Sequence, residues 1–195
     1  VVKALGALAH YVALVAGIGA LVLIAAPIIA VLVARLSLGA YVRAMAPAFA
    51  VAASTQSSLA SLPAMLGACS RLGVRSSTAE FSLPLSVALF RATGPAMNIA
   101  VVIYVAHLTG VPLSISAMVA GVLVAALAEL GTPSLPGAIS FVLSIGPVAL
   151  AMGVPVGPLA LLVAVEMLPE LMRTLGMVAM DVAVTASVDR GKGEQ

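Results

Sequence analysis

Residues 44–70 read AMAPAFAVAASTQSSLASLPAMLGACS, an uncharged apolar segment with a polar centre. Two full membrane crossings need about 40 apolar residues, more than this segment holds. A single crossing would separate the two arginines that precede the segment from the two that follow it, on opposite sides of the membrane. A hairpin that enters the membrane, turns at the polar centre and returns keeps all four arginines on one face. We therefore predict a first re-entrant hairpin over residues 40–75.

The composition of the chain excludes a soluble domain. Of the 195 residues, 63% are hydrophobic and 8% are charged, whereas an average soluble domain is about 45–50% apolar and about 25% charged. Too few polar side chains remain to cover a surface that faces water. The net charge of +2 comes from sparse charges and gives no basic patch for nucleic acid. We expect an integral membrane protein whose surroundings are the lipid bilayer.

The other apolar segments complete an all-α membrane fold. Transmembrane helices are predicted over residues 1–36 and 157–188, and a broken one over residues 76–109. Residues 114–152 are again interrupted at their centre by polar residues, Gly and Pro, which predicts a second re-entrant hairpin. Residues 189–195 form a tail. Two interrupted segments of this kind indicate a transport site at the membrane midplane.

The basic residues predict the orientation of the chain. With both hairpins re-entrant, most basic loop residues share one side of the membrane, and only Lys3 lies on the other. The positive-inside rule then places the C-terminus in the cytoplasm, and we expect the cell (inner) membrane. If only the second hairpin were a single crossing, Arg190 and Lys192 would change sides and the bias would weaken. The basic loop residues on the shared side are Arg35, Arg43, Arg71, Arg75, Arg190 and Lys192.

Several ionisable residues lie inside these apolar segments, where each charge costs roughly 2.5–3.5 kcal/mol on insertion. They must therefore face one another, a wet cavity or a solute. No group of His and Cys residues predicts a metal enzyme, and no Ser-His-Asp set predicts a hydrolase, so we do not expect an enzyme. The ionisable residues within apolar segments are Arg91, Glu129, Glu166, Glu170, Arg173 and Asp181.

The last helix carries a polar stripe. Spacings of three, four and seven residues place Glu166, Glu170, Arg173, Thr174 and Asp181 on one helix face. One interpretation is an intrahelical pair of Glu170 and Arg173 that neutralises itself. The other is that Arg173 binds an anion, because a guanidinium fork suits a carboxylate, beside an acid that serves a cation or a proton. Serines and threonines at the hairpin tips could simply satisfy freed backbone groups, but two tips together with a charged stripe favour a site.

Four motifs in order resemble the second half of a glutamate/dicarboxylate:cation symporter of the sodium:dicarboxylate symporter family. They are TQSSLASLP at 55–63, FSLPL at 81–85, GTPSLPG at 131–137, and Arg173-Thr174 followed by Asp181. The resemblance extends from about residue 5 to 188. It implies an elevator-type transport domain with two re-entrant hairpins, a broken helix and a terminal amphipathic transmembrane helix. The complete family fold has eight transmembrane helices and is a homotrimer. Because the chain begins with Val1, we expect a fragment or a processed product that lacks the N-terminal scaffold half.

The resemblance also implies roles for individual residues. Arg173 corresponds to the arginine that binds a substrate carboxylate, and Glu170 to the acid that holds an amino group. Asp181 corresponds to a sodium ligand. The substrate-binding candidates are Ser57, Ser58, Thr132, Pro133, Ser134, Glu170, Arg173 and Thr174.

The chain departs from the family at the positions that bind sodium. The Asn-Met-Asp-Gly-Thr signature should fall at residues 90–94, which read FRATG, and Met177 stands where the family has an asparagine. These side chains offer few oxygen ligands for sodium. Arg91 could supply a fixed positive charge instead, and Glu129 and Glu166 are candidate proton acceptors.

We therefore expect secondary active transport of a small carboxylate-bearing solute, either an amino acid or a dicarboxylate, coupled to protons. The coupling ion is H⁺ or Na⁺, with no other cofactor. The alternatives are a sodium-coupled carrier or an uncoupled exchanger of the same family, and a non-transporting membrane module that retains the fold.

Overall fold

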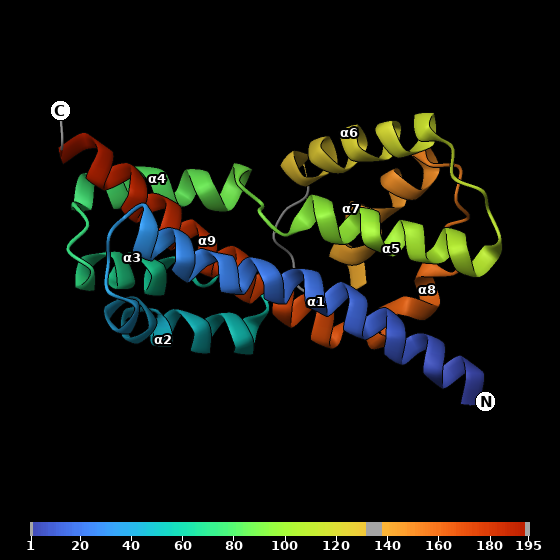
Figure 1. Cartoon of the computed structure of the whole chain (residues 1–195), viewed down its shortest axis with the longest axis horizontal. Helices are drawn as coiled ribbons and strands as arrows, with labels where there is room; N and C mark the ends of the chain where they lie inside the picture. Colours follow the sequence, from blue (N-terminus) through green and yellow to red (C-terminus); the bar gives the residue numbers. More distant parts are fainter. Residues whose placement is uncertain (1, 132–137, 194–195) are drawn as a thin grey trace. The chain divides into compact units, whose positions relative to one another are not determined.

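The computed structural model describes residues 2–131 and 138–193, with side chains for residues 5–130 and 141–191. All regular elements in this described part are helical, as the sequence predicts (Figure 1). They are α1 (Val2–Leu32), α2 (Leu38–Thr55), α3 (Leu62–Arg71), α4 (Ser76–Leu89), α5 (Gly94–Thr109), α6 (Ile115–Gly131), α7 (Ala138–Ala151), α8 (Leu159–Leu162), a 3₁₀ turn (Val163–Val165) and α9 (Met167–Gly193).

Within the described residues, three helical segments are long and apolar enough to cross a membrane: Leu5–Leu32, Ser76–Thr109 and Met167–Gly191. The apolar segments Ile115–Leu130 and Phe141–Ala151 are shorter than the roughly 20 residues that a crossing needs. Large apolar side chains along these helices remain exposed, such as Leu21 and Ile115. Such side chains suit contact with lipid.

The chain forms two compact units, each with its own core. The first unit contains Val1–Gly19 and Thr93–Arg173, and the second contains Ala20–Ala92 and Thr174–Gln195. Both α1 and α9 contribute one end to each unit. Each unit is described separately below.

In the first unit, α5, α6 and α7 pack against one another (Figure 1). Their apolar side chains form a core that includes Val101, Phe141 and Ile145, together with Tyr11 from α1. At Gly19 the backbone of α1 passes so close to α9 that a Cβ atom would lie 2.8 Å from the carbonyl carbon of Met172 and 3.0 Å from the nitrogen of Arg173. A residue without a side chain is therefore required at this crossing.

In the second unit, α2 and α3 form a helical hairpin that packs on α4. The hydroxyl of Ser37 caps α2 by accepting a hydrogen bond from the N–H of Ala40 (3.3 Å), and α2 ends where Gln56 adopts φ 50°. Pro63 lies in the first turn of α3, a position where proline loses no helical hydrogen bond. The core beneath the hairpin includes Met45 and Met65.

The broken helix consists of α4 and α5, which are separated at residues 90–93. Pro95 lies in the first turn of α5, where it starts a helix but cannot continue one from α4. The sequence passes from the second unit to the first within this break, between Ala92 and Thr93.

The last segment differs from the single helix predicted over residues 157–188. It is divided into α8, the 3₁₀ turn and α9, and α9 continues to Gly193. Pro169 has no N–H for the carbonyl of Val165, and its ring crowds that carbonyl. The regular hydrogen-bond pattern therefore begins again after this point, with the N–H of Glu170 donating to the carbonyl of Glu166 at 2.8 Å.

Candidate functional site

Arg173 is a buried arginine near the start of α9, with 4% of its surface exposed. Its backbone is held on two sides. The hydroxyl of Thr93 donates a hydrogen bond to its carbonyl at 3.2 Å, and the backbone at Gly19 packs directly against its nitrogen. Arg173 therefore lies at a fixed place in the first unit.

Among the described residues of the first unit, three side chains surround the Arg173 guanidinium. Its Nε is 3.2 Å from Oε2 of Glu170, and its Nη1 donates a hydrogen bond to Oδ1 of Asn98 at 2.8 Å. The same Nη1 is 3.9 Å from Oε1 of Glu129. Among the described residues, Nη2 of Arg173 has no hydrogen-bond partner. A buried guanidinium thus keeps a donor that can bind a further acceptor.

Of the two interpretations of the Glu170–Arg173 spacing, the intrahelical pair can be compared with this geometry. The intrahelical pair exists at 3.2 Å. It is not isolated, however, because Glu129 and Asn98 also contact the guanidinium. The guanidinium therefore belongs to a network that connects α5, α6 and α9.

Glu166 forms a second buried acidic group in the first unit, with 7% of its surface exposed. The hydroxyl of Tyr11 donates a short hydrogen bond to its Oε1, and its Oε2 has no partner among the described residues. The ring of Tyr11 packs at 5.3 Å against that of Tyr104, whose hydroxyl donates to the carbonyl of Ala7. The charges of Glu166, Glu170 and Arg173 act on one another.

In the second unit, Asp181 is 1% exposed and its Oδ1 has no hydrogen-bond partner among the described residues. The hydroxyl of Thr185, four residues later on α9, also lacks one. The charge of Arg91 acts on the Asp181 carboxyl. Ser57, Ser58 and Thr174 are buried in this unit. Among the described residues, no cluster of three His, Cys, Asp or Glu could hold a metal ion.

The structure thus brings Glu129 together with Glu170 and Arg173, the pair that the spacing along the last helix had already placed on one face. Asp181, Thr174, Ser57 and Ser58 belong to the second unit. The candidates Thr132, Pro133 and Ser134 lie outside the described residues.

Sequence reasoning missed Asn98 and Tyr11. Asn98 is completely buried and hydrogen-bonds both Arg173 and Glu129. It is the only asparagine in the sequence and lies within an apolar segment. A single polar amide in such a segment could have marked it as a candidate for a buried polar contact. Tyr11 is also buried, and its hydroxyl donates a hydrogen bond to Glu166.

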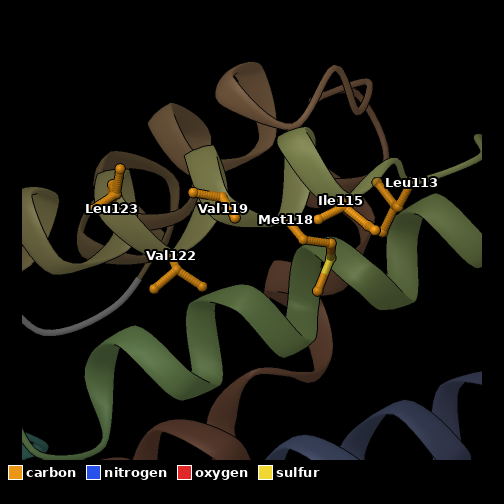
Figure 2. Close-up of a pocket in the computed structure, with 6 residues that line it drawn as sticks. All are labelled: Leu113, Ile115, Met118, Val119, Val122 and Leu123. Atoms are coloured by element: carbon orange, nitrogen blue, oxygen red, sulfur yellow. The ribbon is translucent and has the colours of Figure 1, made fainter.

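A separate groove of about 350 Å³ lies along α6 and the residues that lead into it. Figure 2 shows its lining side chains, which carry carbon and one sulfur but no oxygen or nitrogen. These side chains have no hydrogen-bond donor for a carboxylate, and none of them belongs to the network at Arg173. The lining residues are Leu113, Ile115, Met118, Val119, Val122 and Leu123.

Comparison with known proteins assigns the chain at the level of a family. No curated protein matches the sequence. The model of the sodium:dicarboxylate symporter family matches residues 1–191, which is nearly the whole chain and includes every residue of the Arg173 network. The chain therefore belongs to the sodium:dicarboxylate symporter family, a family of membrane transporters for carboxylate solutes.

Proposed function

We propose that this protein is a secondary carrier that binds a small carboxylate-bearing solute at Arg173 and couples its movement to protons. The observation that carries the proposal is the buried guanidinium of Arg173, whose Nη2 has no hydrogen-bond partner among the described residues. A buried donor without an acceptor is costly. A carboxylate with two oxygens is the acceptor that fits a guanidinium edge best.

The other roles follow from the surroundings of Arg173. Glu170 lies beside Nε and would hold the amino group of an amino acid solute, or a proton if the solute has none. Ser57, Ser58 and Thr174, with Thr132, Pro133 and Ser134 of the second tip, are proposed from the family resemblance alone. So are the re-entrant passage of both hairpins, the elevator motion, the homotrimer and the cytoplasmic C-terminus.

The balance of charge in the first unit supports proton coupling. Its sequence contains three acids, Glu129, Glu166 and Glu170, and all three lie close enough to Arg173 for their charges to interact with it. A solute carboxylate would add another negative charge to this buried group. Proton uptake by one of the acids removes that excess without any metal ligand, and Glu129 and Glu166 are the candidates because they are the most buried.

An uncoupled exchanger is the second candidate, and one observation favours it. The positive charge of Arg91 interacts electrostatically with the carboxyl group of Asp181. Asp181 corresponds to a sodium ligand in the family. A guanidinium fixed in the protein would fill the electrostatic role of sodium without any dependence on a sodium gradient. Such a carrier would exchange solute for solute and ignore both cation gradients.

Uptake by the purified full-length protein in liposomes separates these possibilities. We expect uptake of radiolabelled L-aspartate or succinate to accelerate with an inward proton gradient and to ignore a sodium gradient. Transport that follows sodium alone would contradict proton coupling, and exchange that ignores both gradients would favour the exchanger. Complete absence of uptake and of binding would favour a non-transporting module.

Arg173→Lys tests the binding role while keeping the charge. We expect the affinity for the solute to fall by roughly tenfold to a hundredfold, since a hydrogen bond to a charged group contributes about 1.5–3 kcal/mol and Lys cannot form the fork. Arg75→Gln is the matched control, because Arg75 also pairs with a carboxylate, that of Asp189, but 51% of its side chain is exposed. Equal effects of both substitutions would contradict a specific role for Arg173.

A further inference from the structure

The carboxyl group of Glu129 lies in a seat formed by three helices of the first unit. Glu129 belongs to α6 and is 2% exposed. Its Oε1 accepts a hydrogen bond from Nδ2 of Asn98 on α5 at 2.6 Å and lies 3.9 Å from Nη1 of Arg173 on α9. Oδ1 of Asn98 accepts from the same Nη1 at 2.8 Å. One amide therefore connects the carboxylate to the guanidinium.

Gly94 completes this seat. A Cβ atom at this first residue of α5 would lie 2.6 Å from each carboxylate oxygen of Glu129, well inside van der Waals contact. The carboxyl group of Glu129 therefore packs directly against the backbone of Gly94, with no side chain between them. The start of a helix also favours a nearby negative charge.

Glu129 is nevertheless a poor partner for Arg173. Strong bonds between a guanidinium and a carboxylate have N–O distances of about 2.7–2.9 Å, and this one is 3.9 Å. Nη2 of Arg173 has no partner among the described residues. A free carboxylate on the Nη1–Nη2 edge would make better bonds, but it would place a second negative charge beside Glu129.

We propose that ionised Glu129 and the carboxylate of a bound solute exclude each other at Arg173, so that Glu129 is a built-in competitor that sets the affinity for solute. The inference rests on the proposed function, because it places the solute carboxylate at Arg173. Asn98 is the positioning residue that holds the competitor in its seat. Solute binding then requires Glu129 to leave the seat or to take up a proton.

Glu129→Gln removes the charge and keeps the shape. In the full-length protein at neutral pH, we expect the Kd for L-aspartate or succinate to fall by roughly tenfold or more, because two like charges a few ångströms apart repel strongly in a buried site. An unchanged or weaker affinity in Glu129→Gln would overturn the proposal.

Formate tests the seat without any knowledge of the solute. In Glu129→Ala, we expect sodium formate to raise the midpoint of thermal unfolding above that in sodium chloride of equal ionic strength, because formate occupies the vacated seat. The wild type, whose seat is filled, should show a smaller rise, and so should the double variant Glu129→Ala with Asn98→Leu. Equal rises of the unfolding midpoint in all three proteins, or no rise in Glu129→Ala, would contradict the proposal that Glu129 and a free carboxylate exclude each other at Arg173.

The space at Gly94 provides a third measurement. Gly94→Ala should lower the unfolding midpoint by forcing the carboxyl out of its seat, and adding Glu129→Ala should relieve part of that loss. Gly146→Ala on α7 is the matched control, because a Cβ atom there meets nothing within 4 Å. Additive losses from Gly94→Ala and Glu129→Ala would show that no such seat exists.

These experiments separate the two proposals. If formate stabilises Glu129→Ala but neither L-aspartate nor succinate binds any variant, the seat stands and the proposed solute class is wrong. If the solute binds and Arg173→Lys weakens it, but Glu129→Gln changes nothing, the carrier stands and the competitor is rejected.

Discussion

The hairpin of α2 and α3 and the helix pair of α6 and α7 are held in place by different kinds of contact. The first hairpin, α2 and α3, is stabilised by hydrogen bonds between its own residues. The hydroxyl of Ser61 donates to the carbonyl of Ser57 at 2.9 Å, and that of Ser57 accepts from the N–H of Ala60 at 3.2 Å. Nη2 of Arg71 on α3 donates to the carbonyl of Ala44 on α2 at 2.8 Å.

The second pair is tied to its neighbours through charge. Glu129 on α6 reaches Asn98 on α5 and Arg173 on α9. A neutral hydrogen bond contributes about 1 kcal/mol, one to a charged group about 1.5–3 kcal/mol, and the loss of one partner from a buried ion pair costs about 3–5 kcal/mol. The comparison teaches that the second pair is joined to other helices through one charged network, whereas the contacts described for the first hairpin lie within the hairpin itself.

The largest expected effect is that of Arg173→Leu. It leaves the carboxylates of Glu129 and Glu170 without their buried cation, so we expect the free energy of unfolding to fall by about 3–5 kcal/mol. Amide hydrogen exchange should accelerate in α6 and α7 and remain unchanged at the tip of the first hairpin. If hydrogen exchange accelerated equally in α6 and α7 and in the first hairpin, the two regions would not be held by different kinds of contact.

Asn98→Leu should have the next largest effect. It removes the hydrogen bonds to Glu129 and Arg173, each a bond to a charged group, and we expect a loss of about 2–3 kcal/mol in the free energy of unfolding. Met97→Leu is the control, because it is also fully buried but a swap of similar volume costs below about 1.5 kcal/mol. Similar losses in the two variants would mean that Asn98 acts by packing alone.

Ser61→Ala tests the first hairpin. It removes one neutral hydrogen bond at the tip, so we expect a loss of about 1 kcal/mol and faster hydrogen exchange that is confined to residues 56–71. Ser54→Ala is the control, since the bond from Ser54 to the carbonyl of Val51 is exposed to solvent. A loss as large as that of Asn98→Leu would show that the first hairpin also depends on a single contact.

Arg75→Gln should have the smallest effect. Arg75 pairs with Asp189 at 2.7 Å, but half of its side chain is exposed. Such pairs contribute about 0–1 kcal/mol and are weakened by salt. A loss comparable to that of Arg173→Leu would mean that charge matters regardless of burial, and the explanation of the difference between the hairpins would fail.

The sequence predicted the all-helical arrangement and the residues at the centre of the network. Long apolar runs and their polar interruptions indicate helices locally, and the spacing of Glu170 and Arg173 places them on one face of a helix without knowledge of the tertiary fold. The break between α4 and α5 was visible in the run of Arg91, Thr93, Gly94 and Pro95.

The contacts between distant segments could not be predicted in the same way. Asn98 meets Glu129 and Arg173 only because α5, α6 and α9 pack together, and spacing along the sequence contains no such information. Nor does the sequence indicate that the missing side chain of Gly94 makes room for the carboxyl group of Glu129. The division of the last segment did have a local signal in Pro169, which the long apolar run obscured.

The three tyrosines have a practical consequence. The chain contains no tryptophan, so Tyr11, Tyr41 and Tyr104 are its main sources of intrinsic ultraviolet fluorescence, far stronger emitters than its four phenylalanines. The phenol of Tyr11 is bound to a carboxyl group, an acceptor that quenches emission by drawing away the proton of the excited state. Any event that separates Tyr11 from Glu166 should brighten the protein, which gives the first unit an optical reporter without a label.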